Sequence, residues 1–267
     1  MTAEGIVLVT GGSRGIGAAT AALLAGQGRR VVIVDIAPEA LPGTQTILWP
    51  EAFDVASETI VVKGIADIEA AHGPISGLVN AAGVFGKMHA AARVRMDNWD
   101  REINIDLRGT FLVARSVGVR MVERRHGEIV NVASVAGMTS GPIHAYAAAK
   151  AGVIQITQTL AAEWGRAGVR VNAVSPGFTR TVALEAGISS GALDKNRLAR
   201  NAAMNRLVEP IEVAQAIAWL QGPMSSGVTG INLPVDAGFI AGCTWDAYGG
   251  LPEPSPSSEG GKRNVKS

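Results

Sequence analysis

Two side chains with three alanines between them, Tyr146 and Lys150, have the chemistry of a proton-transfer pair. Residues four apart on a helix project from the same face, so the phenol and the ammonium are expected to lie side by side. An ammonium close to a phenol favours the phenolate, which can move a proton to or from an alcohol oxygen. Ser134, twelve residues upstream, offers a hydroxyl for the same oxygen. Because such pairs also occur by chance on helix surfaces, the rest of the chain must support this interpretation.

The composition indicates one α/β domain. The chain has 267 residues, of which 47% are hydrophobic, 4% are aromatic and 33 are glycine. That length is enough to enclose one large core, and small aliphatic side chains suit a tightly packed sheet. The formal net charge of +1 gives no electrostatic reason to expect nucleic acid or an anionic membrane as a partner.

Cys243 is the only cysteine, which excludes an intrachain disulfide and fits a reducing compartment. The first residues lack a basic region followed by a long apolar stretch, so no signal peptide is expected. No apolar run approaches the roughly 20 residues that a membrane-spanning helix needs. We therefore expect a cytoplasmic protein with no membrane association and no metal site.

Short apolar runs alternate with helical segments along residues 1–249. Strands are predicted at 6–10, 31–35, 77–80, 128–132, 169–174 and 231–235. Helices are predicted at 16–27, 60–71, 96–125 (one or two helices), 146–165 and 210–220. This alternation predicts a parallel, doubly wound sheet with helices on both faces, in a single domain. Residues 250–267 are rich in proline, serine and glycine and are expected to form a flexible tail.

The turn between the first strand and the first helix predicts a phosphate-binding loop. Gly11, Gly15 and Gly17 allow a tight turn, a close approach of backbone to a pyrophosphate, and close packing of the helix on the strand. The helix N-terminus then offers free N–H groups and its positive dipole end. This position between strand and helix favours dinucleotide binding over a plain turn. The contacts expected here are Gly11, Ser13, Arg14, Gly15, Ile16 and Gly17.

Asp35, at the end of the second predicted strand, bears on the choice of nucleotide. A carboxylate about 20 residues beyond the glycines can accept both ribose hydroxyls of adenosine and repels a 2′-phosphate. Arg14 favours NADP instead, because an arginine can pair with the 2′-phosphate. The repulsion is the larger effect, so NAD is expected and NADP is disfavoured. The ends of the next two strand regions supply weaker signals for the same cofactor, at Asp54, Val55, Asn80, Ala81 and Gly83.

Taken together, these motifs closely resemble the short-chain dehydrogenase/reductase family over residues 5 to about 240. The resemblance implies a single Rossmann-type domain that binds NAD(P), and commonly a homotetramer, with a homodimer as the alternative. It implies that Tyr146 is the acid/base, that Lys150 binds the nicotinamide ribose, and that Ser134 orients the substrate oxygen. Further cofactor contacts implied by the family pattern are Tyr146 and Lys150 themselves, Pro176, Gly177, Thr179 and Thr181.

The chain departs from the family pattern at Asp106, where relatives have an asparagine that helps hold a water linking the lysine to bulk solvent. A carboxylate could accept from the same water, so Asp106 is counted with the catalytic residues, whereas Asn104 is expected to be structural. Residues 36–53 contain three prolines, so the usual helix between the second and third strands is expected to be short or lost. Some relatives that oxidise cyclic dihydrodiols share this short segment. The spacing from Ser134 to Tyr146 is one residue shorter than the commonest form, which predicts a tighter loop.

The substrate end is predicted with less detail. Residues 182–207 match the family's lid over the substrate, with a solvated helix pair as the alternative. His144, Phe85 and Met138 are candidates to line a largely apolar pocket, which would suit an alicyclic or aromatic secondary alcohol.

The expected function is NAD-dependent interconversion of a secondary alcohol and a ketone. Within the family, a dihydrodiol dehydrogenase and a 3-oxoacyl-thioester reductase are the alternatives. From other classes, the alternatives are a non-catalytic dinucleotide-binding sensor and a methyltransferase with a similar glycine loop. The methyltransferase would have no use for the tyrosine–lysine pair, and the sensor would not need to retain it.

Overall fold

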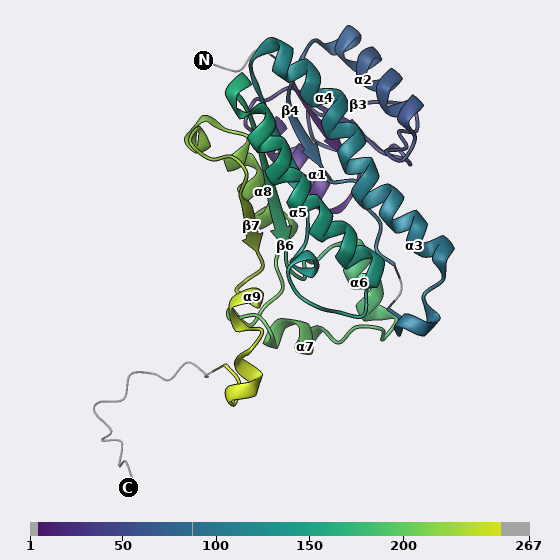
Figure 1. Ribbon diagram of the computed structural model, residues 1–267, viewed down its shortest axis with the longest axis vertical. Helices are drawn as coiled ribbons and strands as arrows, with labels where there is room; N and C mark the ends of the chain where they lie inside the picture. The colour runs from purple at the N-terminus through teal and green to yellow at the C-terminus, as the bar shows by residue number, and fades with distance from the viewer. Residues whose placement is uncertain (1–4, 87, 252–267) are drawn as a thin grey trace, which may run out of the picture.

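Seven parallel strands form one sheet with helices on both faces in the computed structural model, which describes residues 5–86 and 88–251 (Figure 1). The strand order is β3-β2-β1-β4-β5-β6-β7, and every neighbouring pair is parallel. The order changes direction between β1 and β4. In a doubly wound sheet, the carboxyl ends of the strands at such a point form the ligand crevice. The predicted fold class is confirmed.

The strands coincide with the apolar runs of the sequence. Alternate residues of β1 face opposite sides of the sheet, with Ile6 and Leu8 in one core cluster and Val7 and Val9 in the other. The strand bounds are β1 Ile6–Thr10, β2 Val31–Val34, β3 Ile47–Leu48, β4 Ile75–Asn80, β5 Gly127–Val132, β6 Val169–Pro176 and β7 Asn232–Val235. No helix separates β2 from the two-residue β3, and none lies anywhere in residues 36–53, as the three prolines of that segment predict.

Two groups of helices enclose the sheet. α1 (Gly15–Gly26) and α8 (Pro210–Leu220) pack on each other and cover one face. α2 (Glu58–His72), α4 (Thr110–Arg124) and α5 (His144–Trp164) cover the other face. α5 begins two residues before the predicted start, which places Tyr146 in its first turn.

The predicted helical region 96–125 is continuous but changes its pitch. α3 (Met96–Glu102) runs into a π-helical segment, η2 (Ile103–Gly109), and then into α4. A π-helical segment widens a helix by about one residue per turn and is frequent at functional sites. η2 packs against α5, so this widened turn lies beside the helix that carries the tyrosine–lysine pair.

Short helices and loops gather at the end of the molecule toward which β6 and β7 point (Figure 1). Residues 182–207 contain α6 (Val182–Ser189) and α7 (Lys195–Arg200), and α9 (Phe239–Gly242) lies near them. The remaining short helices are η1 Ala91–Arg93, η3 Val135–Gly137, η4 Gly165–Ala167, η5 Pro223–Ser225 and η6 Trp245–Tyr248.

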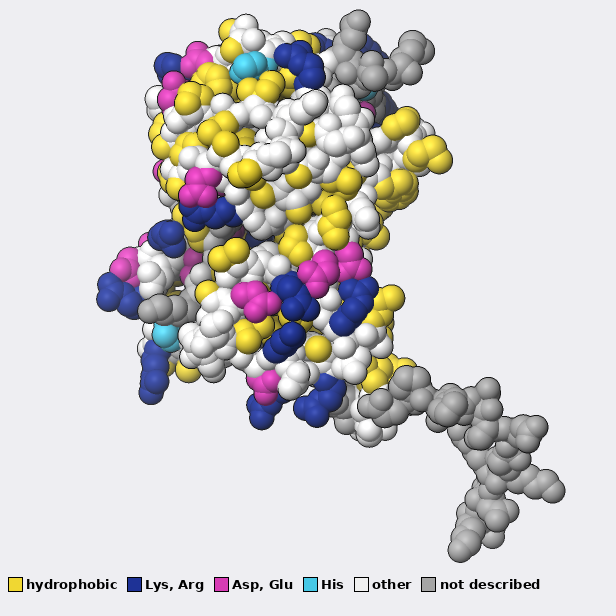
Figure 2. Space-filling model, turned by 180° about the vertical axis from the view of Figure 1, so that it is seen from behind, with side chains coloured by type: hydrophobic (Ala, Val, Ile, Leu, Met, Phe, Trp, Pro, Cys, Tyr) yellow, Lys and Arg dark blue, Asp and Glu magenta, His cyan; other side chains and the backbone are white. Residues whose placement is uncertain are grey.

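Side chains of both charge signs are intermixed on the face shown in Figure 2, where no broad area carries a single sign. Within the described residues, none of the helices is both long and apolar enough to cross a membrane. The predicted tail, 250–267, lies outside the described residues from position 252 onward.

Candidate active site

Ser134, Tyr146 and Lys150 lie on two segments that pack tightly together. Ser134 lies two residues beyond the end of β5. Its Oγ accepts a hydrogen bond from the Ala136 N–H at 3.1 Å, which caps η3. A Cβ on Gly137 of η3 would lie 2.7 Å from the carbonyl carbon of Lys150. Only a glycine therefore allows η3 to approach α5 so closely, and this contact holds the serine loop against the helix of the other two residues.

The ammonium of Lys150 is enclosed. The residue is 4% exposed, and its Nζ donates a hydrogen bond to the Val132 carbonyl at 3.0 Å. The same Nζ lies 5.5 Å from the ring centroid of Tyr146. A buried charge needs compensation, and the nearby charged group is the carboxylate of Asp106.

Asp106 is fully buried in the π-helical segment η2. Its Oδ1 accepts a hydrogen bond from the Val84 N–H at 2.7 Å, and its Oδ2 is buried without a partner among the described residues. Burial raises the pKa of this carboxyl, and the charge of Lys150 opposes that rise. A Cβ on Gly83 would lie 3.1 Å from Asp106 Oδ1 and 3.5 Å from Lys150 Nζ, so the two charged groups flank one small space over Gly83.

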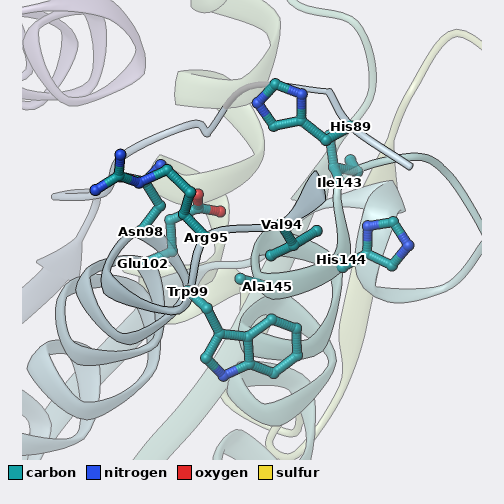
Figure 3. A pocket seen from close by; sticks show the side chains of 9 residues that line it. All are labelled: His89, Val94, Arg95, Asn98, Trp99, Glu102, Ile143, His144 and Ala145. Carbon is teal, nitrogen blue, oxygen red and sulfur yellow. The ribbon is translucent and has the colours of Figure 1, made fainter. Parts of the chain in front are cut away.

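The three predicted substrate-lining residues lie in different surroundings. Phe85 is 57% exposed and meets Tyr146 edge to face, with ring centroids 5.1 Å apart. Met138 is half-exposed and lies beside Asn232, whose Nδ2 is 3.1 Å from its Sδ. His144 lines a small cavity between the start of α3 and the start of α5 (Figure 3).

That cavity is separate from the tyrosine–lysine pair, because neither residue lines it. The Nδ1 of His144 is buried without a partner among the described residues. Figure 3 shows side chains from α3 on one side and from residues 143–145 on the other. The lining residues are His89, Val94, Arg95, Asn98, Trp99, Glu102, Ile143, His144 and Ala145.

The glycine loop has the geometry of an anion cradle. Gly11 and Gly15 have φ of 62° and 55°, which favour glycine. A Cβ on Gly17 would lie 2.2 Å from the Gly11 carbonyl oxygen, so the helix approaches the loop at van der Waals distance. No side chain caps the N-terminus of α1 and no acidic residue lies in its first turn. Its first N–H groups are therefore available to a phosphate.

The carboxylate of Asp35 is fixed beside this loop. It accepts hydrogen bonds from the backbone N–H groups of Ser13, at 3.3 Å, and Ala37, at 3.1 Å. The guanidinium of Arg14 lies 2.9 Å from the Glu39 carboxylate. The one cation of the loop is thus already compensated by an acid 25 residues away, a pairing that spacing alone does not reveal.

The other predicted cofactor contacts shape the backbone at the strand ends. Thr10 Oγ1 accepts hydrogen bonds from the N–H groups of Ala81 and Ala82, at 3.1 and 3.2 Å. The Asn80 side chain is buried and donates to Asn131 Oδ1 at 2.9 Å, which ties β4 to β5. These bonds fix the floor of the crevice between β1 and β4.

Two further segments border the crevice. Asp54 Oδ1 accepts from the Ala56 N–H at 2.9 Å, and Val55 packs on Gly109. On the opposite side, Thr181 caps α6 and its methyl carbon lies 3.5 Å from where a Cβ on Gly15 would be. This contact brings the segment after β6 against the glycine loop.

The rest of that segment runs along the same edge of the sheet. Pro176 ends β6, and the N–H of Gly177 donates to the Val235 carbonyl at 3.0 Å. Thr179 is buried, and its Oγ1 donates to the Gly177 carbonyl at 3.0 Å. Within the described residues, no group of three or more His, Cys, Asp or Glu side chains is placed to hold a metal ion.

Comparison with known proteins decides the family. A family model described as enoyl-(acyl carrier protein) reductase matches residues 11–240. The curated 2,5-dichloro-2,5-cyclohexadiene-1,4-diol dehydrogenase of Sphingobium indicum is 36% identical over 241 residues, covering 88% of this chain and 96% of that protein. The chain belongs to the short-chain dehydrogenase/reductase family. It is an oxidoreductase that acts on CH–OH groups and uses NAD(P).

Solved structures agree on the fold. A structure of levodione reductase is similar with a TM-score of 0.83 and 31% identity, covering 89% of this chain and 98% of that chain. A structure titled ribose-5-phosphate isomerase, from Brucella melitensis, is similar with a TM-score of 0.87 and 43% identity, covering 93% of this chain and 97% of that chain. The two titles name different reactions on one shared fold, so the activity must be argued from the site.

The sequence pattern did not predict that Glu102 is buried near the candidate site. Glu102 is 8% exposed at the end of α3 and lines the cavity of Figure 3. Its distance of four residues from Asp106 was the available signal, because it predicts a shared helix face. Glutamate is rarely buried, and a helix pattern alone gave no reason to expect it here.

Proposed function

We propose that the protein is an NAD-dependent dehydrogenase that interconverts an alicyclic secondary alcohol and its ketone. The observation that carries this proposal is the placement of Tyr146, with the exposed ring of Phe85 on one side and the enclosed ammonium of Lys150 nearby. Such a tyrosine is placed to meet an apolar ring that carries a hydroxyl, with the ammonium of Lys150 5.5 Å from the centroid of the phenol ring.

Each polar residue then has a defined task. In the oxidative direction, the Tyr146 phenolate takes the substrate hydroxyl proton, and the Ser134 hydroxyl orients the same oxygen. When bound, the nicotinamide supplies the hydride acceptor. Lys150 holds the nicotinamide ribose, and Asp106 places a carboxylate near its buried ammonium and accepts a hydrogen bond from a water in the space over Gly83. The unpartnered Oδ2 of Asp106 supports that role.

The residues around the glycine loop fit a dinucleotide, and they favour NAD. The α1 N-terminus and the residues at positive φ would hold the pyrophosphate. Asp35 would accept the adenosine ribose hydroxyls and repel a 2′-phosphate. Arg14 is the one residue that argues for NADP, and its pairing with Glu39 reduces its attraction for a phosphate.

The proposed substrate class rests on Phe85 and on the relatives. An exposed aromatic ring beside the acid/base favours a ring-shaped apolar substrate over a phosphorylated sugar. The relative in Sphingobium indicum is named for a cyclic diol. We propose that α6 and α7, in residues 182–207, form the lid over this substrate. The expected homotetramer, or homodimer, stays a prediction.

Three alternatives remain distinguishable by assay. A 3-oxoacyl-thioester reductase would use the same site on a longer substrate, and a non-catalytic sensor would bind NADH without turnover. An aldose-phosphate isomerase would move protons within one sugar and require no added dinucleotide. Family membership removes the methyltransferase alternative.

The experiment that tests the proposal is a kinetic screen of the purified protein with NAD and NADP. The substrates are cyclic alcohols, cyclic dihydrodiols, hydroxyacyl thioesters, polyols and ribose 5-phosphate. We expect NADH formation with cyclic alcohols or diols and a kcat/KM at least about tenfold lower for the other classes. Reduced-cofactor formation with thioesters alone, or sugar-phosphate conversion without cofactor, would replace the proposed function.

A further inference from the structure

A second buried carboxylate lies directly behind the site. Glu102 ends α3, and its carboxylate faces the backbone N–H of Tyr146 in the first turn of α5. A Cβ on Gly86 would lie 1.8 Å from Glu102 Oε1, so the carboxylate occupies the space that a side chain at position 86 would fill. The glutamate is therefore held between the loop after β4 and the start of the catalytic helix.

Glu102 and Asp106 are electrostatically coupled. They are four residues apart, at the junction of α3 and the π-helical η2, and both are buried. Burial, and next the charge of Asp106, raise the pKa of Glu102. Two neighbouring carboxyls that are largely buried resist double ionisation, so the pair holds a proton more readily than separate carboxyls in water. A pair that holds a proton can both donate and accept one.

The far side of Glu102 leads to solvent. Glu102 lines the cavity between α3 and α5, together with Arg95 and Asn98, whose side chains are exposed (Figure 3). On the side of Glu102 that faces the interior of the protein, Asp106 Oδ1 and Lys150 Nζ flank the space over Gly83. The order from the interior to the surface is thus Lys150, Asp106, Glu102 and the cavity.

We propose that Glu102 is a proton-relay residue, which passes the proton released in alcohol oxidation from Asp106 to water in the cavity lined by Arg95 and His144. This inference rests on the proposed function, because it assigns a path to the proton that Tyr146 takes. It gives a role to a glutamate whose burial is otherwise unfavourable, since removal from water disfavours the charged form of a carboxylate.

The relay conserves protons at each step. The substrate O–H bond breaks as its proton goes to Tyr146, while the hydride goes to the cofactor. Lys150 then gives one Nζ proton to Asp106 and regains one from Tyr146. Glu102 releases the proton that the pair already holds to water, and Asp106 then passes its own proton to Glu102. Reduction of the ketone runs the same transfers in reverse.

Other charged groups set the pH range of this relay. Lys150, on α5, and Arg101, on α3, lower the pKa of Asp106, and Arg101 also lowers that of Glu102. His89, Arg95 and His144 surround the cavity that receives the proton. The charge of Arg101 favours the ionised form of Glu102, which promotes release of the proton to water.

The test measures the pH profile of kcat for alcohol oxidation in the wild type, Glu102→Gln and Asp106→Asn. Glu123→Gln, which removes an exposed carboxylate on α4, is the matched control. We expect Glu102→Gln to lower kcat about tenfold at pH 7, to change the acidic limb of the profile and to leave the NADH dissociation constant unchanged. Imidazole added at high concentration should restore part of the lost rate, and the control should match the wild type.

An unchanged kcat and pH profile in Glu102→Gln would overturn the relay. A loss of rate with an unshifted profile and no imidazole rescue would also overturn it, because it would assign a structural role. Gly86→Ala gives an independent test if the glutamine variant does not fold, since it displaces the carboxylate without removing it. We expect the same loss and rescue, and wild-type kinetics would reject the proposal. Activity in Tyr146→Phe would instead reject the proposed function.

Discussion

The ring of Phe85 meets the ring of Tyr146 edge to face, with centroids 5.1 Å apart and an interplanar angle of 69°. Phe85 comes from the loop after β4, and Tyr146 comes from the first turn of α5. The contact joins the loop after β4 to the helix that carries Tyr146 and Lys150. More than half of the Phe85 side chain remains exposed, so it can also contact a substrate that approaches the phenol.

Phe85→Ala is expected to lower kcat/KM for cyclic alcohols by about fivefold, because an aromatic contact of this kind contributes roughly 1 kcal/mol beyond its buried area. Phe85→Leu, which keeps an apolar side chain, should lose less. Steady-state kinetics with NAD held at saturation measure both variants. Equal kcat/KM values for all three proteins would show that the substrate does not contact this ring.

Asp35 and Glu39 are expected to set the preference for NAD by different means. Asp35→Ala removes the ribose acceptor and should lower kcat/KM for NAD at least about tenfold. Glu39→Gln frees Arg14, so kcat/KM for NADP should rise several-fold without a comparable loss for NAD. In the double variant Glu39→Gln with Arg14→Ala, the gain for NADP should disappear. A wild-type preference for NADP would contradict the account of this loop.

Glu102 is expected to make the stability of the fold depend on pH. Its pKa is raised in the folded protein, so its favourable contribution is present below the pH at which it ionises in the unfolded chain, about 4.3. The contribution is lost as the pH rises through the raised value. Glu102→Gln should therefore stabilise the protein relative to the wild type more at pH 8 than at pH 4.5. Thermal unfolding at the two pH values measures this, and a constant difference would contradict it.

Glu212 should have the opposite pH dependence. Its carboxylate receives two hydrogen bonds of 2.7 Å from Arg206 and one of 2.8 Å from the Glu209 N–H, which closes the capping box of α8. The Arg206 hydrogen bonds lower its pKa to about 2. The resulting stability is present above about pH 4.3 and is lost as the pH falls toward 2.

The variant Glu212→Gln should lower the free energy of unfolding by about 1 kcal/mol at pH 7, the typical value of a helix cap. The difference from the wild type should shrink steadily as the pH falls from about 4.3 toward 2, where about half of the wild-type side chains are neutral. Denaturant unfolding at pH 7 and pH 2.5 measures both values. Equal stability at pH 7 would show that the capping box contributes nothing measurable.

The sheet and its main helices could be predicted because their signals are local. Apolar runs marked six of the seven strands, and the prolines of residues 36–53, two before β3 and one after it, explained the missing helix. The exception was β3 itself, whose two residues are too short to form a pattern. The π-helical η2 was not foreseen, because one extra residue in a turn leaves the apolar periodicity almost unchanged.

The candidate site residues were predicted from residue type and spacing. The ion pairs and the burial around them depend on tertiary contacts, which the sequence pattern does not specify. The pairing of Arg14 with Glu39 joins segments 25 residues apart. The burial of Glu102 follows from the packing of α3 on α5, which no local pattern specifies. The role of His144 in lining the substrate pocket stays a prediction, and in the structure this residue lines the same cavity as Glu102.

The central claim is that Tyr146 moves the proton of the reacting alcohol, and Tyr146→Phe tests it most directly. The substitution removes only the phenolic oxygen, so the fold and the NADH dissociation constant, measured by fluorescence titration, should match the wild type. We predict that kcat with the best cyclic alcohol falls at least about a thousandfold. A variant that binds NADH normally and keeps more than about a tenth of the wild-type kcat would contradict the account, because another group would then be moving the proton.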